Sequence, residues 1–376
     1  MSDPAPSLAR LLPGVAGALE ADGFDVDPAL GLGRWPRVCT VLVDGLGARL
    51  LAERGGHAPA LRRAAQSQPD GAATELRTTV PSTTATALAT LGTGCHPAAH
   101  GLVGYRAFRP GGTGVVNHLT WPADVDPEEW QPHPTVFERV LATGVPVTMV
   151  GPKQFAGSGL TRAALRGPRY VAAESLDARV AAAARALRAT PRAMVNVYWG
   201  DVDKTGHARG CGSHEWAGEL ERIDAGLAAL RRLAPADAVV LVTADHGMVD
   251  CPPQRRLDVA EHPHLREEVL ATAGEPRLVQ LRTGPGAAER VAGRWADALA
   301  GRAEVRVLDS AVAAGWLGGE PGSRVRARVG DVLVAAHGDL AVVDSERDEA
   351  SLLGMVGQHG SVTDVETAVP LLRLLP

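Results

Sequence analysis

Four short apolar runs, each closed by glycine or aspartate, constrain this chain more than any other feature of its sequence. They are VCTVLV at 38–43, VPVTMV at 145–150, AMVNVYW at 193–199 and AVVLVT at 238–243. Strands that are apolar along their whole length belong in a sheet that is covered on both faces. Segments with helical periodicity, as at 177–189 and 215–233, lie between the runs and supply that cover. The sequence therefore predicts an α/β protein with its functional site at the strand ends.

Two stretches fit this alternation poorly. Residues 105–143 are rich in glycine, proline and tryptophan, and we interpret them as a loop-rich cap. Residues 277–344 hold strand-like pieces around a helical segment at 287–300, which predicts an inserted α+β subdomain. Hydrophobic residues make up 45 % of the 376, enough for a sizeable core. We expect residues 1–376 to form a single catalytic domain that carries these two additions.

Charge and hydropathy exclude several classes of protein. The net charge of −5 argues against nonspecific nucleic-acid binding. No apolar run approaches the roughly 18 residues that span a bilayer, and the N-terminus carries an acidic residue where a secretory signal is positively charged. We therefore expect a cytoplasmic protein with no membrane partner. The four scattered cysteines fit thiols better than disulfides, although paired disulfides stay open.

Carboxylates and an imidazole follow two of the apolar runs directly. Asp44 closes the first run, and Asp245-His246 follow the last. A carboxylate at the end of a buried strand costs desolvation energy unless a positive partner is present. For Asp44 alone, Asp-Gly is also ordinary turn chemistry. The adjacent oxygen and nitrogen donors of Asp245-His246 suit zinc or manganese.

Two further motifs offer the same ligand types. Asp203 and His207, four residues apart after the third run, can converge on one ion if the turn between them is tight, or they lie in a solvated loop. His359 lies between glycines that allow close approach to a ligand, or it is a surface histidine. Lys204 stands between two candidate ligands, so it either faces a substrate phosphate or is solvated.

Hydroxyl groups gather at the predicted start of a helix, in PSTTAT at 81–86. Ser82 and Thr83 fit helix caps there, but the same position gives a hydroxyl the backbone N–H groups that stabilise an alkoxide or a phosphate oxygen. A threonine hydroxyl needs a metal to lower its pKa before it can act as a nucleophile. Three carboxylates, three histidines and one hydroxyl make a ligand set for two metal ions with a phosphate between them.

In this order the motifs resemble the alkaline phosphatase superfamily, and most of all its nucleotide pyrophosphatase/phosphodiesterase branch. The matching motifs are a strand ending in aspartate, P-S-T-T followed by T-G-C-H-P-x-x-H-G, D-x-x-x-H, A-D-H-G and G-x-H-G, spread from residue 44 to residue 360. The resemblance implies a three-layer sandwich around a mixed central sheet. It also implies two bound divalent cations, with zinc as the preferred ion and manganese as the alternative.

The resemblance assigns roles to individual residues. Thr84 matches the nucleophile, with Thr83 as its rival if the register is off by one. The ligands of the metal that activates Thr84 correspond to Asp44, Asp245 and His246, and those of the metal on the leaving-group side to Asp203, His207 and His359.

The sequence departs from the branch next to the nucleophile. Tyr105 stands where the branch carries an asparagine that hydrogen-bonds a phosphoryl oxygen, so the donor is Tyr105, Arg106 or Arg109. Ala85-Thr86-Ala87 replaces the usual F-P-N. A diester's second substituent needs an apolar or stacking surface, and the predicted cap offers aromatic rings for it: Tyr105, Phe108, Trp121 and Trp130.

We therefore expect a phosphothreonine-forming hydrolase of phosphodiester or phosphoanhydride bonds in small phosphate esters or nucleotides. Diesters are expected over monoesters, because a monoester dianion needs an additional cationic clamp. The alternatives are a phosphonate (C–P) hydrolase, a phosphomonoesterase, a transferase within a sugar phosphate, and a metal-bearing binding protein without turnover.

Overall fold

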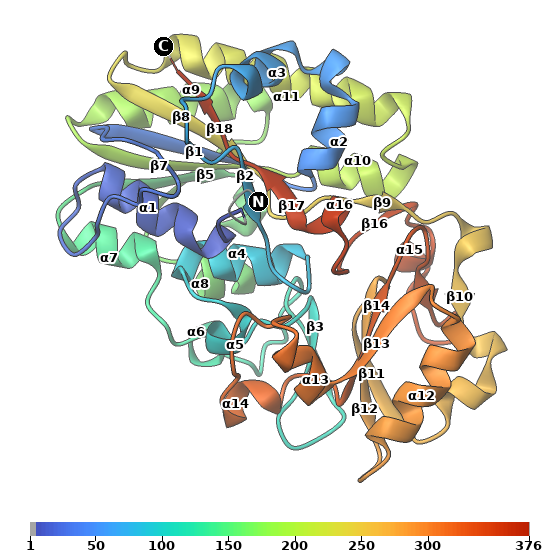
Figure 1. Ribbon diagram of the computed structural model, residues 1–376. Coiled ribbons are helices and arrows are strands. Elements are labelled where there is room, and N and C mark those ends of the chain that lie inside the picture. The colour runs from blue at the N-terminus through green and yellow to red at the C-terminus, as the bar shows by residue number, and fades with distance from the viewer. Residues whose placement is uncertain (1–4, 376) are drawn as a thin grey trace.

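A six-stranded mixed sheet forms the centre of the molecule (Figure 1). The computed structural model describes residues 5–375. The strand order is β18 (Leu372–Leu374), β8 (Ala238–Thr243), β1 (Arg37–Val43), β7 (Ala193–Trp199), β5 (Val147–Gly151) and β6 (Arg169–Ala172). Only β18 runs antiparallel to its neighbour. All four apolar runs of the sequence are strands of this sheet, so the predicted α/β class is confirmed.

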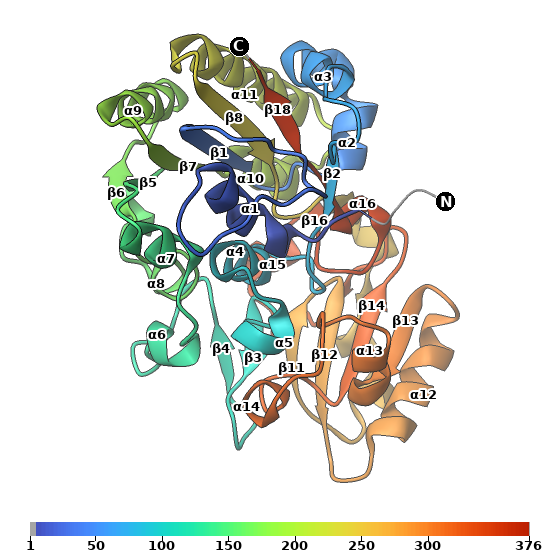
Figure 2. The same ribbon diagram turned by 60° about the vertical axis from the view of Figure 1, so that its left-hand side comes forward.

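Helices cover both faces of the sheet, as Figures 1 and 2 both show. One face carries α3 (Pro59–Gln66), α9 (Leu176–Ala189) and α11 (His214–Leu233). The other carries α1 (Leu11–Ala18), α4 (Thr84–Thr93), α7 (Val136–Ala142) and α8 (Gly159–Ala164). The strands are buried on both sides because apolar residues face each helix layer. The result is the three-layer sandwich expected from the resemblance.

A second sheet, of four antiparallel strands, lies beside the sandwich in Figure 2. Its order is β11 (Val269–Glu275), β12 (Leu278–Thr283), β14 (Val332–Ala336) and β13 (Ala303–Val307). Helix α12 (Ala288–Leu299) packs on it, with Val291, Trp295 and Leu299 in a separate apolar core. That residues 277–344 fold as a unit of their own stays a prediction.

The segment 105–143 contains little regular structure before α7. It holds the hairpin β3 (Arg106–Phe108) and β4 (Val115–Asn117) and the short helix α6 (Pro127–Trp130). Helix α7, in contrast, packs against β5 of the main sheet and buries Val136, Phe137 and Val140 completely. The loop-rich part therefore ends before α7.

Short elements complete the chain. The paired strands are β2 (Glu75–Arg77) with β17 (Ala368–Pro370), β9 (Val249–Asp250) with β16 (Gly357–Gln358), and β10 (Leu257–Asp258) with β15 (Val342–Val343). The remaining helices are α2 (Ala48–Glu53), α5 (Pro97–His100), α10 (Asp201–Arg209), α13 (Leu308–Ala313), α14 (Ser323–Arg326), α15 (Ala350–Leu353) and α16 (Asp364–Thr367). Between residues 5 and 375, no helix is long and apolar enough to cross a bilayer. All four cysteines are free thiols.

Candidate metal centre and catalytic cavity

The first candidate ligand group forms where β1 and β8 end side by side. Asp44 follows β1, and Asp245 and His246 follow β8, so parallel pairing brings the three side chains to one edge. His246 Nε2 lies 3.3 Å from Asp44 Oδ1 and 3.6 Å from Asp245 Oδ2, and all three residues are buried. The turn needs glycine after His246, since a Cβ on Gly247 would lie 2.0 Å from the backbone oxygen of Val365.

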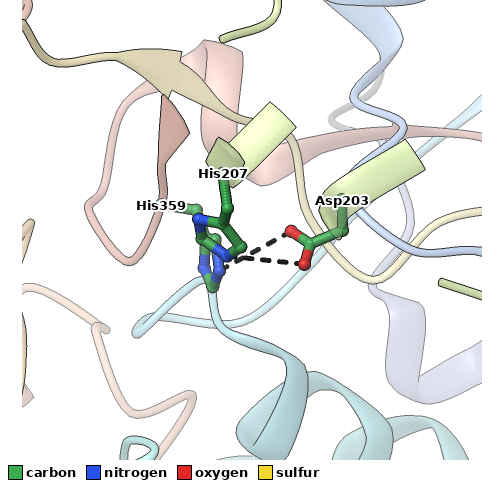
Figure 3. Close-up of side chains that lie close together, drawn as sticks. All are labelled: Asp203, His207 and His359. Atoms are coloured by element: carbon green, nitrogen blue, oxygen red, sulfur yellow. Dashed lines mark ion pairs between the residues drawn. The ribbon is translucent and has the colours of Figure 1, made fainter. Parts of the chain in front are cut away.

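The second group joins a helix to a distant loop (Figure 3). Asp203 and His207 lie one turn apart on α10, and His359 follows β16. His207 Nε2 is 3.4 Å from Asp203 Oδ2, and His359 Nε2 is 3.9 Å from Asp203 Oδ1. The two residues of the D-x-x-x-H motif therefore converge through a helical turn, where a tight loop was expected.

The two groups adjoin. The rings of His246 and His359 stack with their centroids 3.6 Å apart. Within each group, one ligand atom from every residue lies within 4.8 Å of the others. The structure thus brings together all six carboxylates and imidazoles that the sequence singled out.

Hydrogen bonds from outside the site direct the ligand atoms inward. Each imidazole Nδ1 contacts a backbone carbonyl oxygen: His207 that of Gly357 (2.7 Å), His246 that of Gly247 (3.1 Å) and His359 that of Ser82 (2.9 Å). Each ring then donates from Nδ1 and turns the lone pair of Nε2 toward the carboxylates. This is the usual way a protein sets the tautomer of a metal-binding histidine.

The carboxylates show the same division between a satisfied and a free oxygen. Tyr198 donates its hydroxyl to Asp44 Oδ2, and the N–H groups of Gly45 and His246 donate to Asp245 Oδ1 (3.2 and 3.1 Å). In contrast, Asp44 Oδ1, Asp245 Oδ2 and Asp203 Oδ1 are buried without a hydrogen-bond partner among residues 5–375. Buried lone pairs that face one another are costly unless a cation lies between them, so this donor set fits divalent metal ions.

Burial shifts the pKa values of the three carboxyl groups and of two imidazoles. It raises the pKa of Asp203 and of Asp245 to about 7, and it raises the pKa of Asp44 well above its ordinary value, with Asp245 adding to the effect. Burial also lowers the pKa of His246, and that of His359 well below its usual range. Neutral imidazoles are the form in which histidine binds a metal.

Thr84 faces the first group from the start of α4. Its hydroxyl Oγ1 lies 3.2 Å from His246 Nε2. Thr83 is the N-cap residue of that helix, is 2 % exposed, and makes no side-chain capping bond. This geometry favours Thr84 over Thr83 as the nucleophile.

A cavity of about 430 Å³ opens beside Thr84 and the second ligand group. Tyr105 and Arg106 line it, and their role in substrate binding stays a prediction. Arg106 is held by Asp348 (3.2 Å) and by the backbone oxygen of Gly274 (3.3 Å). Burial raises the pKa of Tyr105 to about 12, so its phenol stays a neutral donor.

Two cationic candidates lie elsewhere. Lys204 is exposed on α10 and does not line the cavity. Arg109 pairs with Asp124 on the surface (2.7 Å). The exposure of Lys204 agrees with its solvated alternative, and the assignment of Lys204 to substrate binding stays a prediction.

Most aromatic rings of the predicted cap pack against other parts of the fold and do not line the cavity. Phe108 is fully buried, and the guanidinium carbon of Arg282 lies 4.6 Å from the centroid of its ring. The guanidinium carbon of Arg328 lies 3.7 Å from the ring centroid of Trp130. Trp121 donates its indole N–H to the backbone oxygen of Val125 (2.9 Å). Of the four rings proposed for the substrate, only Tyr105 lines the cavity.

Sequence reasoning missed Glu275, a cavity-lining carboxylate at the end of β11. It is 2 % exposed and its Oε1 accepts the N–H of Tyr105 (2.6 Å), while its Oε2 has no partner in the described part of the chain. Burial raises its pKa to about 8. A carboxylate at the end of a strand was the available signal, but β11 belongs to the second sheet, and only the packing of that sheet beside the main one brings Glu275 to the cavity.

Comparison with known proteins adds family and fold. The sequence pattern of the family described as type I phosphodiesterase/nucleotide pyrophosphatase matches residues 38–362. No curated protein matches the chain in sequence. Phosphonoacetate hydrolase from Sinorhizobium meliloti 1021, in complex with phosphonoacetate, superposes with a TM-score of 0.70 at 20 % identity, over 90 % of each chain.

Two structures of a mammalian protein are similar to a comparable degree. Murine ectonucleotide pyrophosphatase/phosphodiesterase 5 has a TM-score of 0.68 at 18 % identity, over 90 % of this chain and 88 % of that one. An inactive variant of it in complex with AMP has a TM-score of 0.69 at 17 % identity, over 89 % and 87 %. At these identities the likeness shows the fold.

Proposed function

Because this chain belongs to the type I phosphodiesterase/nucleotide pyrophosphatase family, we propose that it is a metal-dependent hydrolase of phosphodiester or phosphoanhydride bonds in small molecules. One observation carries the proposal. Three unpartnered carboxylate oxygens and three imidazole Nε2 atoms face one another, and the Thr84 hydroxyl lies 3.2 Å from one of those nitrogens.

The six side chains would hold two divalent ions, with zinc as the preferred ion and manganese as the alternative. Asp44, Asp245 and His246 would bind one, and Asp203, His207 and His359 the other. Such ions, when bound, lower the pKa of a hydroxyl and neutralise charge on a leaving oxygen.

The chain's own groups account for the rest of the chemistry. The Thr84 oxygen attacks phosphorus in line, so that an Oγ1–P bond forms as the bond to the leaving oxygen breaks. His246 Nε2 would hold the ion that lowers the pKa of the Thr84 hydroxyl, so the hydroxyl proton passes to water in the open cavity. Backbone N–H groups at the start of α4 stabilise the phosphoryl oxygens. A water molecule then attacks the phosphothreonine and restores Thr84.

The charges around the cavity support diesters over monoesters. A monoester dianion needs a free cationic clamp. Arg106 is engaged by Asp348, Arg109 and Lys204 lie outside the lining, and Arg347 is exposed at the mouth. Tyr105 is neutral, which suits a singly charged phosphoryl group.

A phosphonate hydrolase is the second candidate, favoured by the superposition with phosphonoacetate hydrolase. One comparison separates the candidates. Protein purified without chelator is analysed for metals, loaded with zinc or manganese, and assayed on bis-p-nitrophenyl phosphate, p-nitrophenyl phosphate and phosphonoacetate. We expect two ions per chain and the highest kcat/KM on the diester. Preference for the monoester or the phosphonate would replace the diesterase assignment, and no metal together with no activity would overturn the hydrolase.

A further inference from the structure

The cavity beside Thr84 has one wall that the proposed chemistry does not use. Leu119 follows β4, Leu352 lies on α15, and Met355 follows that helix, yet all three line the same cavity. Leu119 is 53 % exposed, among the most exposed of the large apolar side chains between residues 5 and 375. A single exposed leucine is ordinary, but three apolar side chains from two distant segments around one cavity form an apolar surface that a ligand can cover.

The same cavity offers a nucleobase little aromatic surface on which to stack. Tyr105 is the only phenylalanine, tyrosine or tryptophan of its lining in the described structure, and Arg106 lies 5.2 Å from the ring centroid. A flat base therefore finds no second ring with which to form a stack. Trp121 and Trp130 cannot supply one, because their rings are packed into the fold.

The cavity is also poorly suited to a highly charged leaving group. Its lining holds two arginines, Arg106 and Arg347, beside three carboxyl groups, those of Asp203, Glu275 and Glu349. Arg106 is already paired with Asp348, so no buried cation remains for a second phosphate.

We propose that the substrate is a phosphodiester in which the substituent bound by the cavity is aliphatic and uncharged. This inference rests on the proposed function. Its phosphoryl group lies between Thr84 and the second ligand group, and its alkyl chain covers Leu119, Leu352 and Met355. Of the substrates that the proposed function admits, this selects alkyl diesters over nucleotides.

Binding to the inert Thr84→Ala variant tests this without turnover. The variant is loaded with zinc, and calorimetry measures its affinity for inorganic phosphate, for methyl ethyl, methyl butyl and methyl hexyl phosphate, and for the methyl ester of AMP. All four diesters carry one negative charge. We expect about a fourfold gain in affinity for each methylene that becomes buried. The AMP ester should bind more weakly than methyl hexyl phosphate.

Matched variants test whether the gain in affinity per methylene comes from the apolar side chains of the cavity. Leu119→Ser and Met355→Ser should flatten the dependence on chain length. Leu233→Ser, an equally exposed leucine at the end of α11 away from the cavity, should leave it unchanged.

The outcomes separate the inference from the function beneath it. If neither phosphate nor any diester binds the loaded protein, both fail. If phosphate binds but affinity does not depend on chain length, or the AMP ester binds more tightly than the hexyl ester, the aliphatic substrate is wrong and the hydrolase stands.

Discussion

Some residues of the site are candidate metal ligands, and others orient those ligands through hydrogen bonds. Tyr198 and the N–H groups of Gly45 and His246 occupy one oxygen of Asp44 and of Asp245 and leave the other free. Such partners are worth roughly 10- to 100-fold in metal affinity when they are removed from known sites. Thr84, whose Oγ1 lies 3.2 Å from His246 Nε2, is the residue that we propose receives the phosphoryl group.

Thr84→Ala should abolish turnover while folding and metal content remain close to those of the wild type. In the proposed mechanism the hydroxyl is the attacking group, and six other side chains would hold the metal ions. We expect kcat on bis-p-nitrophenyl phosphate to fall by at least roughly a thousandfold. Thr83→Ala is the control, and full activity in Thr84→Ala with loss in Thr83→Ala would move the nucleophile by one residue.

Glu275→Gln should change how stability depends on pH. The native state holds the Glu275 proton more tightly than the unfolded chain does, since burial raises the pKa from 4.5 to about 8. The wild type therefore loses stability as pH rises between those values, and the amide variant does not. Across that pH window, the free energy of unfolding of the variant should rise relative to that of the wild type by on the order of 4 kcal/mol.

Urea unfolding at a series of pH values measures this difference. The exposed Glu349→Gln serves as the control and should follow the wild type at every pH. Parallel curves for Glu275→Gln and the wild type would show that Glu275 is ionised at low pH in the folded protein.

At the scale of elements, one buried ion pair links the second sheet to both metal-binding loops. Arg277 at the start of β12 makes two hydrogen bonds to Glu366 (3.1 and 2.7 Å), and both side chains are fully buried. Glu366 accepts the N–H of Ser361 on its side chain (3.0 Å) and the N–H of Gly247 on its backbone oxygen (2.9 Å). The loops that carry His359 and His246 thus share one anchor.

Arg277→Met should destabilise the fold by roughly 3–5 kcal/mol, because it leaves the Glu366 carboxylate buried without its partner. Urea unfolding measures the change. The control is Arg326→Met, which breaks an exposed pair with Asp309 and Glu320 and should cost no more than about 1 kcal/mol. Equal costs in the two variants would mean that the buried pair does not anchor the loops.

At the scale of the whole molecule, the site closes only when distant parts of the chain meet. The main sheet supplies Asp44, Asp245 and His246, α10 supplies Asp203 and His207, and the loop after β16 supplies His359. Three buried carboxylates in this space repel one another unless cations are bound.

Removal of metal should therefore lower the melting temperature of the entire protein. Ions that bind the native state alone stabilise it by about 2.7 kcal/mol per site at a hundredfold excess over Kd. Scanning calorimetry before and after chelation, and again after addition of zinc or manganese, measures the loss and its recovery. Asp203→Asn should recover less than the wild type, and a melting temperature that ignores both chelator and metal would contradict the two-ion site.

The sequence by itself determined the elements of this protein and the kinds of atoms at their ends. The four central strands, the helices α9 and α11, and the ligand types Asp and His after the strands follow from local periodicity and from turn residues. Those signals act between neighbours in the chain, so they can be read without knowing the fold. Parallel pairing then requires Asp44 and Asp245 to meet.

Only the tertiary structure decided which other side chains reach the cavity. Glu275 lines it from the second sheet and Lys204 is exposed outside its lining, whereas the rings of Trp121 and Trp130 pack within the fold. Each outcome depends on contacts between segments far apart in the sequence, where burial and hydrogen bonding compete for the same side chain. Local patterning specifies the residue type at a position, but the neighbours that satisfy it exist only once the chain has folded.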